Sequence, residues 1–332
     1  MFDKFRNILR QSRSREYLYR LLKLLDSVPL YNWIYRYRIE SKARAIPQFP
    51  PELSIETTNL CNAHCSICAH PDMKRPKGKM ATELVMSLID QAAAGKVNKL
   101  YLSGFGEPLV DKRLPEFVAR ARDKGIPVIS IVTNAQLLDS DLAASLIDAG
   151  INEINISIDG FTAESYARTR LGLNFERVID NIKELHAIIE LRPSSHGKVR
   201  VLVSAVDLLS NRHERVIANQ LLGKYVDHIY FRQAQGWTAN YGHMIAGYSP
   251  HFRPNRIPCR YLWDSMSVYI DGRVPPCCLD YEAEQSMGDA AQMSLAEIWH
   301  GERFANYRRL HLENRKSELN PCSRCGYYSV WW

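Results

Sequence analysis

Strand-like and helix-like stretches alternate along the chain between residues 53 and 231, and this alternation restricts the fold more than any other feature. The short β runs are Leu53–Thr57, Lys99–Ser103, Val128–Thr133, Glu153–Ile158, Val199–Val206 and His228–Phe231. Between them, apolar residues recur at helical spacing in Thr82–Ala94, Leu114–Lys124, Ser140–Ala149, Phe175–Glu190 and His213–Leu222. Such repeats with short connections predict a parallel sheet with crossover helices. The periodicity alone leaves open whether this sheet is open or forms a barrel.

Residues 1–48 carry the whole net charge of the chain. They hold eleven Lys or Arg against four Asp or Glu, an excess of seven that equals the net charge of +7 of all 332 residues. Apolar and aromatic side chains recur there at helical spacing until Pro47, Pro50 and Pro51 end the pattern. We interpret this segment as helices that pack on the outside of the body, as most amphipathic helices do. The alternative is peripheral contact with an anionic membrane surface.

The remaining residues, 49–332, are neutral by formal count, which argues against a nucleic-acid groove across the body. The sequence shows neither a signal-peptide pattern nor a run of 18 apolar residues. We therefore expect a cytoplasmic protein, peripheral at the inner membrane surface only if residues 1–48 bind there. In a reducing cytosol, grouped cysteines more often bind metal than form disulfides.

The pattern of the chain changes after residue 235. The stretch Gly236–Arg256 is rich in Gly, Pro, Tyr and Asn and has no clear period. Ser265–Ile270 and Arg273–Pro275 are predicted to form a hairpin, with a type I′ turn at Asp271-Gly272. Ser294 with Glu297 forms a capping box that opens a predicted helix, Leu295–Leu310. We therefore divide the chain into a basic helical extension (1–48), an α/β body (49–235) and a small C-terminal module (236–332).

The eight cysteines fall into two groups. Cys61, Cys65 and Cys68 form a C-x3-C-x2-C run directly after the first predicted strand, and the other five lie between residues 259 and 325. Three thiolates can hold a four-iron cluster only if one iron lacks a protein ligand, so the first group predicts a cluster with an open coordination site. A fully ligated cluster normally takes four cysteines. The second group therefore has one cysteine to spare.

The C-x3-C-x2-C run after the first strand of an α/β repeat resembles the radical S-adenosylmethionine (SAM) enzymes, and the resemblance covers residues 51–332. It implies a partial (β/α)6 TIM-like barrel and a [4Fe–4S] cluster on Cys61, Cys65 and Cys68 whose open iron chelates SAM. It also implies that SAM is cleaved to a 5′-deoxyadenosyl radical, which abstracts hydrogen from a substrate C–H. Ile67 departs from the family, in which this position is usually aromatic.

Further stretches that resemble the family follow the next three strands. Gly104–Pro108 (GFGEP) resembles the GGEP stretch that contacts the amino group of SAM, with Phe105 in place of the usual first glycine. Thr133-Asn134 is similar to the segment near the SAM ribose, and Ser157 begins an S-x-D-G stretch. Arg170 resembles an arginine that often faces the SAM carboxylate. The SAM-binding residues that the resemblance implies are Phe105, Gly106, Glu107, Thr133, Asn134, Ser157 and Arg170.

The C-terminal cysteines resemble the SPASM extension of the family, which binds auxiliary [4Fe–4S] clusters. The resemblance implies one auxiliary cluster on Cys259, Cys277, Cys322 and Cys325, although four thiolates would also suit structural zinc. Cys278 is then left over. If residues 277 and 278 are extended, their side chains point to opposite faces, and Cys278 would face the substrate as a hydrogen donor. The alternatives are a cysteine that only packs and an exchange of roles between Cys277 and Cys278.

The resemblance implies an enzyme with one of two chemistries. In an oxidation, the substrate radical loses an electron to the auxiliary cluster, whereas in an epimerisation Cys278 returns hydrogen to the opposite face. We expect a hydroxylated or aminated small molecule, such as a sugar or an aminoglycoside-like compound, as substrate. We also expect an external one-electron donor such as flavodoxin or ferredoxin, and no nucleic-acid partner. The alternatives are modification of a ribosomally made peptide, and a non-catalytic Fe–S electron carrier or maturation partner.

Overall fold

The computed structural model describes residues 43–192, 197–208, 210–233, 258–323 and 325, with four further positions between 33 and 41. Most of the basic segment 1–48 and the whole stretch Gly236–Arg256 lie outside the described residues. The helices predicted for the basic segment, and its contact with a membrane surface, therefore stay predictions. No helix in the described ranges is long and apolar enough to cross a membrane.

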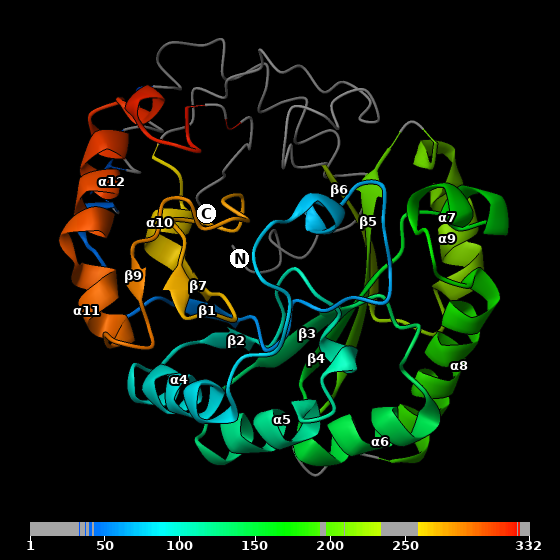
Figure 1. The fold of residues 1–332 in the computed structure, drawn as a ribbon. Helices are drawn as coiled ribbons and strands as arrows, with labels where there is room; N and C mark the ends of the chain where they lie inside the picture. The colour runs from blue at the N-terminus through cyan, green and yellow to red at the C-terminus, as the bar shows by residue number, and fades with distance from the viewer. Residues whose placement is uncertain are drawn as a thin grey trace.

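The six predicted strands form one parallel sheet, to which a seventh strand is added. The strand order is β6-β5-β4-β3-β2-β1-β7, and each pair of neighbours is parallel. Figure 1 shows the sheet curving into an arc, which gives the predicted partial barrel rather than an open sheet. The strands are β1 Glu52–Ile55, β2 Lys99–Tyr101, β3 Ile129–Thr133, β4 Glu153–Ser157, β5 Arg200–Asp207, β6 His228–Gln233 and β7 Ser265–Val268.

The seventh strand corrects the predicted hairpin. Its predicted first arm is Ser265–Ile270, but Ser265–Val268 pairs in parallel with Glu52–Ile55 of the barrel sheet. The second arm, β8 (Arg273–Val274), pairs antiparallel with β9 (Gly288–Asp289). Of the two turn residues only Gly272 has a positive φ, 85°, so the turn is not of type I′. The strand after the turn therefore belongs to the C-terminal module, whereas the strand before it extends the barrel.

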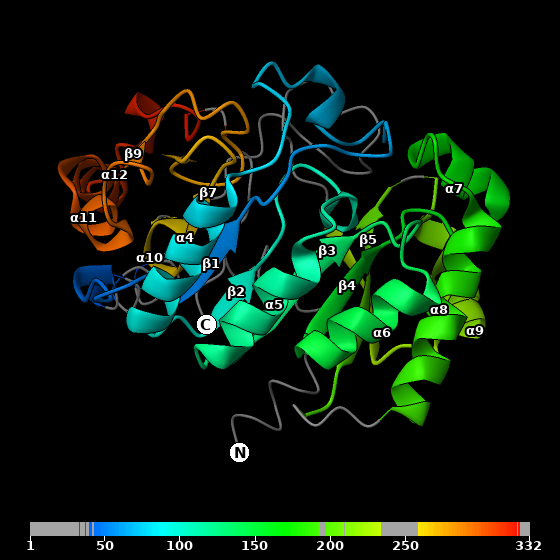
Figure 2. The same ribbon diagram turned by 60° about the horizontal axis from the view of Figure 1, so that its bottom comes forward.

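Helices cover the outer face of the arc (Figures 1 and 2). They are α4 Thr82–Ala94, α5 Leu114–Asp123, α6 Ser140–Ala149, α8 Phe175–Leu191 and α9 Arg215–Leu222. These confirm the predicted helices, except that the last one begins with a 3-10 turn, η3 (Arg212–Glu214). An additional helix, α7 (Ala163–Thr169), was not predicted and begins at a capping box of Thr162 and Ser165.

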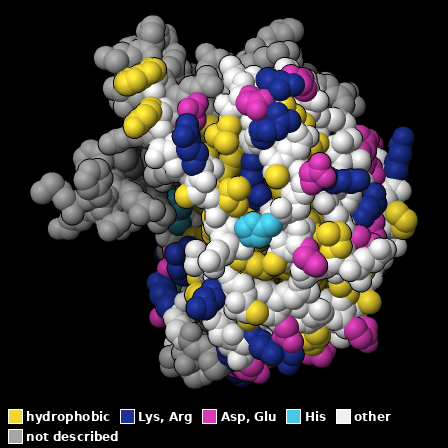
Figure 3. Space-filling model, turned by 90° about the vertical axis from the view of Figure 1, so that its left-hand side faces the viewer, with side chains coloured by type: hydrophobic (Ala, Val, Ile, Leu, Met, Phe, Trp, Pro, Cys, Tyr) yellow, Lys and Arg dark blue, Asp and Glu magenta, His cyan; other side chains and the backbone are white. Residues whose placement is uncertain are grey.

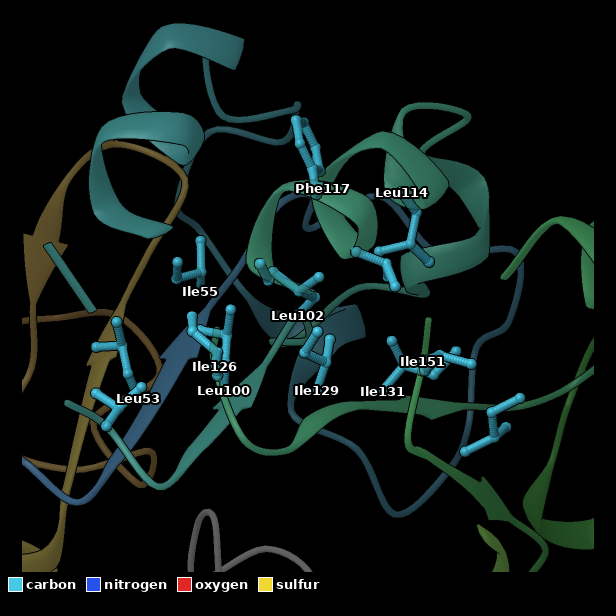
Figure 4. Packing of buried hydrophobic residues seen from close by; sticks show 14 of the residues in the cluster. Leu53, Ile55, Leu100, Leu102, Leu114, Phe117, Ile126, Ile129, Ile131 and Ile151 are labelled. Atoms are coloured by element: carbon cyan, nitrogen blue, oxygen red, sulfur yellow. The ribbon is translucent and has the colours of Figure 1, made fainter. Parts of the chain in front are cut away.

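Hydrophobic side chains fill the layer between the sheet and these helices. Figure 4 shows Ile55 of β1 and Leu102, directly after β2, on the side of the sheet that faces α5, which carries Phe117. Alternate residues of a strand point to opposite faces. In β4, Ile154 and Ile156 belong to this core, and the alternating polar residues of that strand point toward the inside of the arc. Full burial of each such side chain contributes roughly 1.5–3 kcal/mol.

The C-terminal module contains short helices beside the barrel. They are α10 Tyr261–Asp264, α11 Leu295–His300 and α12 Glu302–Leu312, followed by η5 Lys316–Glu318. The capping box of Ser294 and Glu297 is confirmed. The prediction of one continuous helix, Leu295–Leu310, is wrong, because Gly301 is extended (φ −65°, ψ 159°) and separates α11 from α12. Glycine is a poor helix residue, which makes the break inexpensive there.

The described end of the basic segment packs on this module. The indole N–H of Trp263 donates to the carbonyl oxygen of Ala43 (2.7 Å), and that of Trp299 donates to the carbonyl oxygen of Pro47 (2.9 Å). Residues 43–47 therefore pack on the body of the protein, as interpreted from the sequence.

Figure 3 views the side of the molecule that carries α11 and α12, where Lys or Arg and Asp or Glu side chains are interspersed over its described part.

Candidate active site

The loop that carries the first three cysteines leaves the C-terminal end of β1. The end of α7 and the segment after it hold this loop, because the N–H groups of His64 and Ser66 donate to the carbonyl oxygens of Leu171 (2.9 Å) and Thr169 (3.0 Å). Buried backbone groups need such partners. The unpredicted helix α7 therefore helps to fix the path of the cysteine loop.

Cys61, Cys65 and Cys68 are thiols in largely buried surroundings. Burial raises the pKa of Cys61 to about 12 and raises the pKa of Cys65 and Cys68 above the ordinary thiol value. A thiolate in such a place needs positive charge nearby, which bound iron supplies. The Arg170 guanidinium lies 3.8 Å from Cys65 Sγ, and the His70 N–H lies 3.4 Å from Cys68 Sγ. These residues fit the [4Fe–4S] cluster that the resemblance implies.

The Gly104–Pro108 loop after β2 packs against the base of the cysteine loop. A Cβ atom on Gly106 would lie 2.6 Å from the carbonyl oxygens of Leu60 and Thr58, so the two backbones can approach only because this residue is glycine. The N–H of Glu107 donates to the same Leu60 oxygen at 2.8 Å. The motif thus places its backbone directly beside the residue before Cys61.

Phe105, which stands where the family usually has glycine, faces the C-terminal module. Its ring lies 6.0 Å, centroid to centroid, from the rings of Tyr269 and Tyr281. The sequence placed Phe105 among the SAM contacts, and its backbone does lie in the expected loop. Its side chain instead joins an aromatic group between the barrel and the module.

Glu107 connects the loops after β2 and β3. One carboxylate oxygen accepts the Thr133 hydroxyl (2.5 Å) and the Leu109 N–H (3.1 Å), and the other accepts the Asn134 N–H (2.7 Å). Burial raises the pKa of Glu107 to about 6, although these three donors oppose the shift. Asn134 in turn donates to the side-chain oxygen of Asn62 in the cysteine loop (2.8 Å). The structure therefore brings three of the predicted SAM-binding residues together beside that loop.

Arg170 lies between the cysteine loop and the end of β4. Its guanidinium pairs with Asp159 (2.5 Å) and approaches Cys65, as described above. Burial alone would lower the pKa of Arg170, but Asp159 and Cys65 raise it above the ordinary value. Ser157 is half-buried at the last position of β4, opposite Ser204 of β5. Ser157 thus lies at the C-terminal end of a strand, where α/β folds bind ligands, and Arg170, directly after α7, reaches that end through Asp159.

The predicted ligands of the auxiliary cluster lie near one another. Burial raises the pKa of Cys277 well above the ordinary value, and Cys278, Cys322, Cys325 and Cys259 raise it further. Cys278 has different neighbours: burial raises its pKa to about 11, Cys325 adds to this rise, and Arg232 of β6 opposes it. The other three predicted ligands thus all lie close enough to Cys277 to affect its pKa, whereas the pKa of Cys278 is affected by Cys325 and by Arg232 of the barrel.

The described cysteines do not form a site for a single metal ion. No three His, Cys, Asp or Glu side chains in the described ranges converge as the ligands of one metal ion would. A cluster of four irons is larger than one ion and spaces its thiolates farther apart. The arrangement is therefore compatible with clusters at both places.

The inside of the arc is lined by polar side chains. Asn155 donates to the Tyr230 hydroxyl (2.6 Å), and Arg232 donates to the Ser204 hydroxyl (3.3 Å). At the opposite, N-terminal ends of the strands, Glu153 pairs with Lys99 and with Arg200 and accepts the Ser130 hydroxyl. That ionic group lies at the far end of the barrel. The end near the cysteines keeps hydroxyl, amide and guanidinium groups.

Comparisons with known proteins agree with this geometry. The model of the radical SAM superfamily matches residues 55–195, and that of the SPASM iron-sulfur cluster-binding domain matches residues 259–326. The chain belongs to the radical SAM superfamily. It has a C-terminal SPASM domain, and its cofactors are accordingly a SAM-binding [4Fe–4S] cluster, an auxiliary cluster and SAM.

Two relatives differ in how much of this chain they match. The probable GTP 3′,8-cyclase of Methanocaldococcus jannaschii is 36% identical over 134 residues, which are 40% of this chain and 44% of that protein. The chain thus spans less than half the length of this relative. The S-adenosyl-L-methionine-dependent 2-deoxy-scyllo-inosamine dehydrogenase of Niallia circulans is 24% identical over 286 residues, which are 84% of this radical SAM chain and 93% of that protein.

Solved structures share the fold. BtrN in complex with AdoMet and 2-DOIA has a TM-score of 0.59 at 20% identity, over 85% of this chain and 95% of that one. SuiB of Streptococcus suis bound to precursor peptide SuiA has a TM-score of 0.67 at 16% identity, over 88% of this chain and 72% of that one. At these identities the likeness concerns the fold alone.

Sequence reasoning missed three residues of this radical SAM site. Asp159 holds Arg170, and Glu56 forms a buried ion pair with Arg75. Two of them carried a signal, because Glu56 directly follows an apolar strand and Asp159 stands inside the S-x-D-G stretch. A carboxylate at the C-terminal end of a buried strand usually has a partner. Arg75 lies in a polar loop and carried no such signal.

Proposed function

We propose that this radical SAM enzyme oxidises or epimerises a hydroxylated or aminated small molecule, such as a sugar or an aminoglycoside-like compound. The observation that carries the proposal is the polar lining at the cysteine end of the arc, where Asn155, Ser204, Tyr230 and Arg232 lie on neighbouring strands. Such groups pair with the hydroxyl and amino groups of a substrate of this kind. The alignment with the dehydrogenase of Niallia circulans, which spans most of both chains, supports it.

The residues of the first site would bind and orient the cofactors. When bound, the cluster and SAM supply the radical chemistry that abstracts hydrogen from a C–H bond. Cys61, Cys65 and Cys68 would hold the cluster. The backbone of the Gly104–Pro108 loop would face SAM, because the Glu107 carboxylate is already engaged by three donors. Thr133, Asn134, Ser157 and Arg170 would complete the SAM contacts.

Cys278 would act on the substrate after hydrogen abstraction. As a donor, its S–H would give a hydrogen atom to the substrate carbon, and the sulfur radical left behind would need one electron and one proton to recover. In an oxidation, the substrate radical would instead lose an electron to the auxiliary cluster, held by Cys259, Cys277, Cys322 and Cys325, and a proton to solvent. The proximity of Arg232 to Cys278 supports a position facing the barrel. An external one-electron donor such as flavodoxin or ferredoxin would serve the first cluster.

Modification of a ribosomally made peptide is the second candidate. It is favoured by the similarity to the PqqA peptide cyclase of Granulibacter bethesdensis, 34% identical over 120 residues. That match covers only 36% of this chain and 32% of the cyclase. The polar lining described above fits a small molecule better. A non-catalytic electron carrier would lack turnover with either class of substrate.

The experiment uses reduced, cluster-loaded enzyme with SAM in deuterium oxide. Aminocyclitols, aminoglycosides and free sugars are offered in turn, and 5′-deoxyadenosine is measured above the substrate-free level. We expect one of these classes to stimulate its formation. An epimerase acting through Cys278 would place solvent deuterium at one product carbon. Its Cys278→Ala variant would still abstract hydrogen from the substrate but would form little epimer. A dehydrogenase would give a product two mass units lighter without that deuterium. Stimulation only by peptides would overturn the proposal.

The remaining proposals concern the division of the chain into domains and its location in the cell. We propose the division into an extension (1–48), a radical SAM barrel (49–235) and an auxiliary-cluster module (236–332), noting that β7 from the last part completes the barrel sheet. A cytoplasmic location is proposed with it. Contact of residues 1–48 with an anionic membrane would show as vesicle binding that weakens as salt screens the charge.

A further inference from the structure

Glu56 and Arg75 form a buried ion pair that the proposed reaction does not use. The two guanidinium NH2 groups of Arg75 donate to the two carboxylate oxygens of Glu56 at 2.8 and 3.0 Å, and both side chains are 1% exposed. Burial alone would lower the pKa of Arg75, but the hydrogen bonds and charge of Glu56 raise it. The pair is therefore charged and held in a fork geometry that only arginine offers.

The carboxylate of Glu56 also receives two backbone groups from different parts of the fold. One oxygen accepts the N–H of Phe105 in the loop after β2 (3.0 Å). The other accepts the N–H of Ile270, two residues beyond the end of β7 (3.1 Å). Each oxygen is thus used twice, and the carboxylate joins the GFGEP loop to the start of the C-terminal module.

Arg75 reaches the segment that follows Cys277 and Cys278. Its Nε donates to the carbonyl oxygen of Tyr281 (2.6 Å), and its guanidinium lies 3.9 Å from the ring centroid of Tyr269. The carboxylate of Glu282 accepts the backbone N–H groups of Lys74 (2.7 Å) and Arg75 (3.0 Å). We call the set Glu56, Arg75, Tyr281 and Glu282 the clamp.

The clamp joins the exits of the two cysteine segments. Arg75 lies in the connection that follows Cys68, after the turn η1 (His70–Asp72), and Tyr281 lies in the loop that follows Cys277 and Cys278. Residues some 200 positions apart in sequence are thereby fixed to one another at the base of both loops. A buried ion pair adds little stability compared with apolar residues of the same size, but it fixes geometry when each charge is fully hydrogen-bonded.

We propose that the clamp is a positioning device, which fixes the Cys277–Cys278 segment relative to the loop of Cys61, Cys65 and Cys68. It thereby sets where Cys278 stands over the barrel. Either fate of a substrate radical requires a group of the module at a fixed place, and small misplacements of reacting groups are costly. The inference rests on the proposed function only for the effect on the substrate radical. The relative position of the two segments is measurable without a substrate.

The test compares cluster-loaded enzyme with Arg75→Lys and with Glu282→Ala. The first keeps the charge beside Glu56 but loses the fork, and the second removes only the acceptor of two N–H groups at a partly exposed place. Iodoacetamide labelling of Cys278 is followed by peptide mass spectrometry, together with hydrogen exchange of residues 277–284. In both variants we expect the rate of Cys278 labelling and the rate of hydrogen exchange to rise at least about fivefold, because this segment then opens locally more easily. The iron content of the first cluster should stay at the parent level.

Glu297→Ala is the matched control, since it removes another carboxylate that accepts a backbone N–H in the same module, at the capping box of α11. It should lower thermal stability without changing Cys278 labelling. If the clamp variants label and exchange like Glu297→Ala, or if they lose the iron of the first cluster, the clamp does not act between the two segments and the inference fails. Failure of Cys278→Ala to affect product would instead count against the donor role alone.

Discussion

Single residues at this site act through close backbone contact. Gly106 illustrates this, because the GFGEP loop can lie against Thr58 and Leu60 only without a side chain there. The motif predicted that this stretch belongs to the SAM site. It did not predict that Phe105 joins an aromatic group with Tyr269 and Tyr281, or that Glu56 and Arg75 pair. Those contacts connect residues far apart in sequence, and no local pattern records them.

The first prediction at this scale concerns Gly106→Ala. The added Cβ would press on two backbone oxygens at 2.6 Å, so the cysteine loop must shift. We expect a loss of about 1–3 kcal/mol in unfolding free energy and less iron bound at the first cluster. Gly78→Ala is the control, since the nearest atom to its Cβ would be Ile270 Cδ1 at 3.9 Å. Equal iron content in both variants would contradict the role given to Gly106.

The elements of the fold follow local sequence signals where these are strong. Periodic apolar residues predicted the six barrel strands and the outer helices, since alternating or helical burial is what those elements require. Three features were not predicted. β7 pairs with β1 across more than 200 residues, α7 is a short helix within a loop, and Gly301 divides α11 from α12. The pairing of β7 depends on tertiary contacts, whereas the capping box of α7 and the glycine at 301 are single local signals against a longer sequence pattern.

Helix caps give the prediction at this scale. The Ser294 hydroxyl accepts the N–H of Glu297 at the start of α11, and the Glu297 carboxylate accepts the N–H of Ser294. Ser294→Ala should therefore lower the free energy of unfolding by about 1 kcal/mol. Ser87→Ala, at an exposed position inside α4, should be neutral or slightly stabilising. Thermal denaturation of both variants measures the difference, and equal effects would show that the capping box contributes nothing.

In the whole molecule, two cysteine-bearing segments meet over one end of a barrel that is polar inside. The β/α order predicted where the first segment lies, because ligands of α/β folds gather at the C-terminal ends of strands. The sequence also predicted which cysteines form the second group. How the two segments are joined was beyond prediction, since the clamp draws its members from three separate parts of the chain.

The central claim is that Cys61, Cys65 and Cys68 hold the cluster that cleaves SAM. The most direct measurement is 5′-deoxyadenosine formation, with iron content, by the reduced triple variant in which all three are replaced by Ala. The account predicts the loss of one cluster's iron and of SAM cleavage, whereas Cys322→Ala with Cys325→Ala should lose iron but still cleave SAM without substrate. Formation of 5′-deoxyadenosine by the triple variant at the parent rate would contradict it.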